Sequence, residues 1–157
     1  QDNVLDLALV TLPASGTNLD VTPLLEDEFV AVTAPDGVEL PRRVSPKALA
    51  RLPMIMFEPG AHTRLVADQW FLRAAIEIKP TMALDSVEAI KRLVGAGLGC
   101  AILPAMALQE KGDRARLIVR QLSPRLHRKL AIVVRRDKIL HRGLRETLRA
   151  LRDLKGR

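Results

Sequence analysis

Short apolar runs alternate with stretches of helical periodicity along this chain. Eight segments have the apolar or β-branched character of strands: Val4–Val10, Val21–Leu25, Phe29–Ala34, Pro53–Phe57, Ile76–Ala83, Cys100–Leu103, Leu117–Val119 and Leu130–Val134. Segments 65–75 and 87–97 repeat apolar residues at helical spacing, and so does a C-terminal leucine stripe at positions 140, 144, 148 and 151. Strands that alternate with helices indicate an α/β fold.

A helix start is predicted at Asp85 and Ser86, whose side chains suit the N-cap position. Glu88 follows Asp85 by three residues, which is the spacing of a capping box. Beyond this helix, Cys100–Leu103 is an apolar run closed by Pro104, and it predicts a buried strand. The unit is therefore a helix, a turn and an inner strand.

Three alternating glycines, Gly95, Gly97 and Gly99, separate this helix from the strand. They lack the G-x-G-x-x-G spacing of a dinucleotide-binding loop, and they follow a helix instead of leading into one. Carbonyl groups, not N–H donors, point outward at a helix C-terminus. We therefore interpret the glycines as the end of the helix and the reversal of the chain, not as a phosphate site.

Charge is distributed unevenly over the 157 residues. Residues 1–100 contain 9 Lys and Arg against 13 Asp and Glu, a net charge of −4, whereas residues 101–157 contain 16 against 5, a net charge of +11. The basic part suits contact with nucleic acid or an acidic partner, or a solvated arginine face. Aromatic residues make up only 3% of the chain and include no Tyr, so platforms for base stacking are missing, and we favour the solvated face.

Several classes of protein are disfavoured by what the sequence lacks. The single cysteine, Cys100, excludes an internal disulfide and suits a reducing cytoplasm. No stretch reaches the length of a membrane span. A signal peptide has a basic region before its apolar run, and the apolar run near this N-terminus has none. No catalytic triad, carboxylate pair, metal-ligand cluster or cofactor motif occurs at a recognisable spacing, so we expect neither an enzyme nor a bound metal or cofactor.

One candidate for a ligand site is the turn Gly60–Arg64, just ahead of the helix predicted at 65–75. A Gly, a His, a Thr and an Arg stand where the N–H groups of a helix start point outward, which favours a carboxylate or another small anion. Capping of the helix by Thr63, with Arg64 solvated, explains the same residues equally well. Thr11 follows the first strand, where α/β sheets bind ligands, but its hydroxyl also suits a turn.

Four segments of the chain occur in an order typical of one bacterial family. They are Asp6–Leu9, Leu25–Val32, the turn Gly60-x-x-Thr63-Arg64, and the segment from Asp85 to Pro104, DSVEAIKRLVGAGLGCAILP. In this order they resemble the effector-binding domain of LysR-type transcriptional regulators, over nearly the whole chain. The last segment is the most specific of the four.

The resemblance implies a two-lobed α/β fold of the type 2 periplasmic-binding-protein class. Residues 1–28 and 133–157 are expected in the first lobe and residues 29–132 in the second, with crossing strands at Phe29–Ala34 and Leu130–Val134. The first strand, helix and following strand of the family's domain are expected to be missing, which leaves the first lobe incomplete. The DNA-binding domain of such regulators is also expected to be absent from this chain.

The resemblance further implies an effector in the cleft between the lobes. The residues expected around it are Thr11, Gly60, His62, Thr63, Arg64, Asp85 and Ser86. The implied effector is a small molecule, most simply a carboxylate anion, bound by a cytoplasmic homo-oligomer that touches DNA only through the absent domain. The alternatives are one lobe of a solute-binding protein, which shares this fold, and an enzyme.

Overall fold

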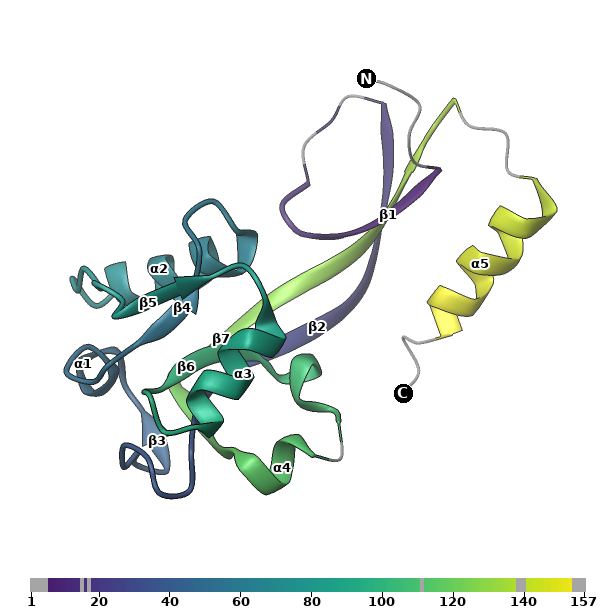
Figure 1. Cartoon of the computed structure of the whole chain (residues 1–157). Coiled ribbons are helices and arrows are strands. Elements are labelled where there is room, and N and C mark those ends of the chain that lie inside the picture. The colour runs from purple at the N-terminus through teal and green to yellow at the C-terminus, as the bar shows by residue number, and fades with distance from the viewer. Residues whose placement is uncertain (1–5, 15, 17, 111, 138–140, 154–157) are drawn as a thin grey trace. The chain divides into compact units, whose positions relative to one another are not determined.

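The computed structural model describes residues 6–14, 16, 18–110, 112–137 and 141–153 (Figure 1). The elements in chain order are β1 Leu7–Thr11, β2 Leu19–Thr33, β3 Arg43–Val44, α1 Pro46–Leu49, β4 Ile55–Phe57, α2 His62–Leu72, β5 Met82–Leu84, α3 Val87–Gly95, β6 Ala101–Pro104, the 3-10 helix η1 Ala105–Leu108, α4 Asp113–Arg116, β7 Ile118–Arg135 and α5 Arg142–Asp153. The predicted α/β class is confirmed. Val4, Leu5 and Leu140 of the predicted elements lie outside the described residues.

Two long strands replace four of the short ones that the sequence predicts. β2 continues through the acidic segment 26–28, and β7 joins the runs predicted at 117–119 and 130–134. The acidic residues do not interrupt β2, because each has a cation on β7. The ion pairs are Glu26 with Lys129 (3.6 Å), Asp27 with Arg128 (2.8 Å) and Glu28 with Arg125 (3.8 Å). The strand predicted at Ile76–Ala83 is also wrong in extent, since only Met82–Leu84 pairs with a neighbour.

The strands form two sheets. The larger sheet has the order β1-β7-β2-β6, and β3 adds to β7. β1 and β7 are antiparallel, as are β2 and β6, whereas β3 runs parallel to β7. β4 and β5 form a separate parallel pair. A single parallel bridge between Met54 and Cys100 connects the start of β4 with the start of β6.

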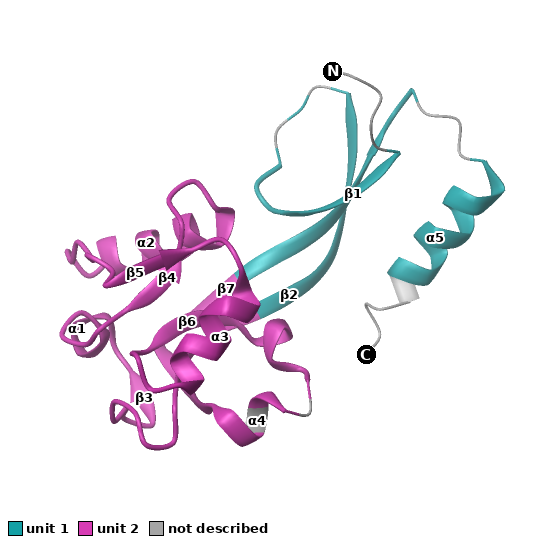
Figure 2. Cartoon of the chain, in the orientation of Figure 1, with its two compact units in different colours: residues 1–27, 128–157 teal, residues 28–127 magenta. Residues whose placement is uncertain are grey.

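The chain divides into two compact units (Figure 2). Unit 1 comprises residues 1–27 and 128–157, and unit 2 comprises residues 28–127. In unit 1, Leu144 and Leu148 of α5 are buried in one cluster with Leu24 and Ile132, so the leucine stripe is core packing, as predicted. Arg142, Arg145 and Arg149, on the other faces of α5, are exposed. The lobe boundaries implied by the resemblance stay a prediction.

β2 is buried on both faces within unit 2. Phe29 and Ala31 belong to one hydrophobic cluster, which also contains Trp70 of α2. Val30 and Val32, the alternate residues, belong to a second cluster with apolar residues of α3 and β6. A strand with apolar side chains on both faces needs cover on both, and α2 and α3 belong to opposite clusters.

Helices α2 and α3 end with the same backbone motif, in which two N–H groups turn back to the last turn of the helix. The hydrogen bonds, donor first, are Ala75 to Leu72 (2.9 Å) and Ile76 to Phe71 (3.1 Å) after α2, and Gly97 to Val94 (2.9 Å) and Leu98 to Leu93 (3.2 Å) after α3. The residue that reverses the chain has φ +56° at Ala75 and +80° at Gly97. Because a side chain is disfavoured in this region, the alanine is the strained member of the pair.

We expect Ala75→Gly to raise the free energy of unfolding by roughly 0.5–1 kcal/mol and Gly97→Ala to lower it by a similar amount. A Cβ atom at Gly97 would meet nothing within 4 Å, so backbone conformation alone decides that effect. Urea denaturation of both variants and the parent measures both changes. Equal stabilities of the parent and the two variants would contradict the left-handed conformation at Ala75 and Gly97.

Candidate functional site

The two parallel strands β4 and β5 end at the same edge of their sheet. Phe57 lies opposite Leu84, and the N–H of Glu58 donates to the carbonyl oxygen of Leu84 at 3.0 Å. The turn that leads to α2 follows β4, and Asp85 and Ser86 follow β5. The carboxyl ends of neighbouring parallel strands lie at the same edge of a sheet. The residues that follow them, Gly60–Arg64 and Asp85–Ser86, are therefore brought together at this edge.

The start of α2 carries backbone donors for which the described residues provide no side-chain cap. Its N-cap is Ala61, which offers no capping hydrogen bond, and its first turn contains no acidic residue. The N–H groups of His62, Thr63 and Arg64 therefore have no carbonyl partner within the helix. Thr63 is the second residue inside the helix, so the alternative in which it caps the helix is wrong. Gly60, exposed at φ +94°, turns the chain into this start.

Arg64 is fixed to its own unit. Its Nε donates to both carboxylate oxygens of Asp68, at 2.8 and 3.0 Å, and one terminal nitrogen donates to the carbonyl oxygen of Phe57 at 2.9 Å. Its side chain is only 11% exposed. The guanidinium group thus fastens α2 to the end of β4, while the Arg64 N–H still faces the helix start. The partner, Asp68, follows Arg64 by four residues, a helical ion-pair spacing that is readable in the sequence.

The start of α3 has a side-chain cap. Ser86 is the N-cap, and its Oγ accepts from the N–H of Ala89 at 3.4 Å, which confirms the predicted cap. The predicted capping box is wrong, because Glu88 is the second helical residue and pairs with Lys91 at 2.7 Å. Asp85 is exposed just before the cap. Of the two helix starts at this edge, α3 has a side-chain cap, and the described residues give α2 none.

Thr11 belongs to a different unit from the other six candidate residues. It is the last residue of β1, lies half-buried opposite Leu130 of β7, and is part of unit 1. Its participation in one site with residues of unit 2 stays a prediction. His62 is exposed at the first position of α2.

Several chemistries find no support within the described ranges. No group of three or more His, Cys, Asp or Glu among these residues is arranged to hold a metal ion. No helix in the described part of the chain is long and apolar enough to cross a membrane. Cys100 is fully buried, and this burial raises the pKa of its thiol to about 12. The thiol therefore stays protonated at neutral pH and is a small core residue, as the sequence indicated.

Comparison with known proteins connects this fold to a family of regulators. Residues 1–155 match the family model described as LysR substrate binding domain. A probable hydrogen peroxide-inducible genes activator of Mycobacterium avium is 31% identical over 86% of this chain and 44% of its own length. The uncharacterized HTH-type transcriptional regulator YeiE of Escherichia coli is 32% identical over 91% of this chain and 49% of its own length. The chain thus spans about half the length of these relatives.

Solved structures agree with the sequence comparison. The regulatory domain of Synechocystis CcmR in complex with 2-PG superimposes with a TM-score of 0.85 and 26% identity, over 98% of this chain and 74% of that one. The reduced form of OxyR from N. meningitidis superimposes with a TM-score of 0.77 and 21% identity, over 96% of this chain and 71% of that one. The fold is therefore the type 2 periplasmic-binding-protein-like fold of such regulatory domains, as predicted.

Proposed function

This chain belongs to the LysR substrate binding domain family, and on that basis we propose that it is the effector-binding part of a transcription regulator. The effector that we propose is a small anion, most simply a carboxylate, held at the start of α2. The regulators among its relatives favour this function over a solute-binding protein or an enzyme.

The open N-terminus of α2 is the observation that supports this proposal. Three N–H groups share a start that has no side-chain cap among the described residues and no acidic residue in its first turn. The helix dipole adds a partial positive charge there, so an anion gains both hydrogen bonds and electrostatic stabilisation. The hydroxyl of half-buried Thr63 and the imidazole of exposed His62 are further contacts that we propose.

The first compound to test is 2-PG, the ligand named for CcmR, followed by simple carboxylates at millimolar concentration. A ligand present at a hundred times its dissociation constant stabilises a folded protein by about 2.7 kcal/mol. A thermal-shift screen detects a change of this size. Calorimetry then gives the affinity for the variants below.

We expect Thr63→Glu to weaken this binding without harming the fold. A carboxylate at the second position of α2 competes with the ligand for the same N–H groups and repels an anion, so affinity falls by about tenfold or more. The same carboxylate interacts favourably with the helix dipole and raises the free energy of unfolding by roughly 0.3–1 kcal/mol. Calorimetric titration and urea denaturation measure the two effects separately.

The matched control is Gln69→Glu, which places the same negative charge on an exposed position of the same helix, away from its start. This variant is expected to keep the affinity of the parent. A ligand that binds Thr63→Glu as well as it binds the parent rules out the start of α2 as the effector site.

The remaining parts of the proposal concern the whole regulator. Relatives about twice as long leave room for a separate DNA-binding domain, and we propose that DNA is read there and not by this chain. We further propose a homo-oligomer that works in the cytoplasm, where bacterial chromosomes lie. A gel-shift experiment at physiological salt tests the first point, since specific binding of an operator by the isolated chain would refute it.

A further inference from the structure

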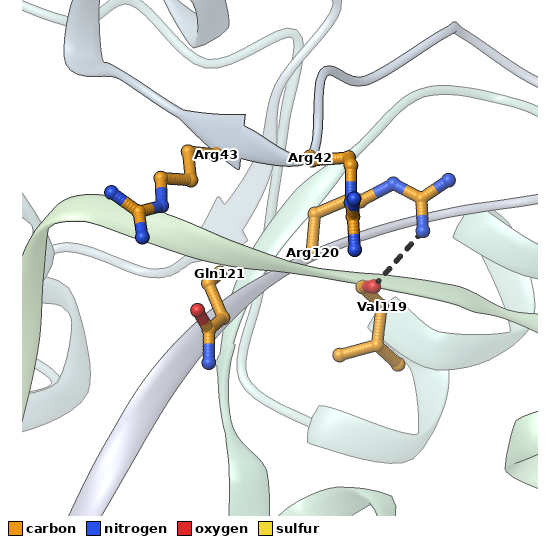
Figure 3. Close-up of a pocket in the computed structure, with 5 residues that line it drawn as sticks. All are labelled: Arg42, Arg43, Val119, Arg120 and Gln121. Carbon is orange, nitrogen blue, oxygen red and sulfur yellow. Dashed lines mark hydrogen bonds between the residues drawn. The ribbon is translucent and has the colours of Figure 1, made fainter.

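We propose that unit 2 has a second anion site, which binds an oligophosphate on the face where β3 meets β7. The site is a hollow of about 710 Å³ lined by Arg42, Arg43, Val119, Arg120 and Gln121 (Figure 3). All five residues belong to unit 2. None of them belongs to the site proposed for the effector.

Strand register explains why Arg43 and Gln121 share a face of the sheet. β3 pairs with β7 in parallel, with Arg43 opposite Gln121 and Val44 opposite Leu122. Val44 and Leu122 are buried in the core of unit 2. Successive side chains of a strand point to opposite faces, so Arg43 and Gln121 are both directed to solvent. The core thus fixes the outward direction of the polar pair.

The hollow holds three positive charges without a compensating carboxylate. Its lining contains no Asp or Glu. Within the described ranges, no carboxylate forms an ion pair with Arg42, Arg43 or Arg120. Arg120 donates to the carbonyl oxygens of Leu40 (3.4 Å) and Val119 (3.5 Å), which orients the guanidinium group without cancelling its charge.

The chemistry of the lining points to phosphate groups in series. A guanidinium group binds a phosphate with two parallel hydrogen bonds, and three such groups match several phosphates better than a single anion. The lining has no aromatic side chain on which a base could stack. Recognition therefore rests on the phosphate chain itself, and inorganic tripolyphosphate should bind about as well as a nucleoside triphosphate.

Calorimetric titration of tripolyphosphate into the whole chain tests the proposal, with the variants Arg43→Gln and Arg120→Gln. Each variant is expected to bind about tenfold more weakly than the parent, because it loses a charge-assisted contact. Circular dichroism checks that both variants are folded. The matched control is Arg145→Gln, which removes the same charge from an exposed position of α5 in unit 1 and is expected to keep the parent affinity.

Four results would overturn the assignment. The first is no binding of tripolyphosphate at millimolar concentration. The second is equal weakening by Arg145→Gln, which would indicate a general charge effect. The third is weakening by Thr63→Glu but not by the arginine variants, which would move the ligand to α2. The fourth is a short duplex DNA that binds the hollow and that tripolyphosphate cannot displace, which would identify the phosphates of nucleic acid as the partner.

Discussion

Replacing Gly99 with Ala is expected to lower the free energy of unfolding by about 3 kcal/mol, because the position has no room for a methyl group. A Cβ atom there would lie 2.3 Å from the carbonyl oxygen of Pro53, a backbone atom that cannot rotate away. The same oxygen accepts from the N–H of Cys100 at 2.9 Å, and the N–H of Ile55 donates to the carbonyl of Cys100 at 2.8 Å. The substitution therefore strains the bonds that join β4 to β6.

Urea denaturation measures this loss, and a thermal melt should show a decrease in Tm of roughly 6–12 °C. The matched control is Gly95→Ala, four residues earlier in the same glycine run. Gly95 is the last residue of α3, and a Cβ atom there would lie at an ordinary 3.7 Å from Arg116. Alanine favours a helix, so this variant should be more stable by roughly 0.5 kcal/mol. If both variants lose stability equally, the close approach of Pro53 to Gly99 is not the cause.

The second large effect is expected at Lys91, a buried cation of α3. Its side chain is 4% exposed, and its Nζ lies 2.7 Å from Glu88 and 3.0 Å from Asp113. It also donates to the carbonyl oxygen of Ala107 at 3.0 Å. One ammonium group thus connects α3 with η1 and α4. Because Asp113 is itself buried, loss of the cation would leave a carboxylate without its compensating charge.

We expect Lys91→Met to lower the free energy of unfolding by about 3 kcal/mol, because removal of one member of a buried ion pair leaves the other uncompensated. Lys79→Met is the control at an exposed position and should change stability by less than about 0.5 kcal/mol. The double variant Lys91→Met/Asp113→Leu should recover much of the loss, since an apolar pair replaces the whole ion pair. An equally unstable double variant would contradict an electrostatic origin of the loss.

The pKa of Lys91 determines how the stability difference between the parent and Lys91→Met depends on pH. Burial lowers the pKa of Lys91, but hydrogen bonds and charge interactions with Glu88 and Asp113 outweigh burial and raise it above the ordinary 10.5. A raised pKa in the folded state means that the charged side chain stabilises the fold at every pH below 10.5. That contribution is lost as the pH rises through the folded-state pKa. The stability difference between the parent and Lys91→Met should therefore be constant near neutral pH and shrink above pH 10.5.

The glycine run illustrates the limit of sequence reasoning for this fold. The sequence predicts that Gly95, Gly97 and Gly99 together end a helix and reverse the chain, which is correct for Gly97 alone. Gly95 lies within the helix, and Gly99 allows a backbone from another strand to approach. Local spacing cannot separate the three roles, because the close approach involves Pro53, which is distant in sequence.

The same limit of local sequence patterns applies to the strands and to the candidate site. From the sequence, the acidic segment 26–28 predicts a break between two strands, but β2 continues through it. The basic partners of these residues on β7 lie about a hundred positions away, and no local pattern identifies them. The turn Gly60–Arg64 predicts an anion site, but it leaves the role of Thr63 open. The observed N-cap, Ala61, decides that Thr63 does not cap the helix, and the contact with Asp68 and Phe57 shows that Arg64 holds α2 in place.

By itself, the sequence determined the α/β class, the family and the helix–glycine–strand unit from Asp85 to Pro104. These depend on periodicity, on apolar character and on the order of short motifs, all of which are local in the chain. Only the tertiary structure decided that α2 and α3 begin at one edge of a sheet, that Lys91 is buried between two carboxylates, and that three arginines share one hollow. Each of these depends on strand pairing or packing between distant residues, and the energies that select such contacts are absent from any local pattern.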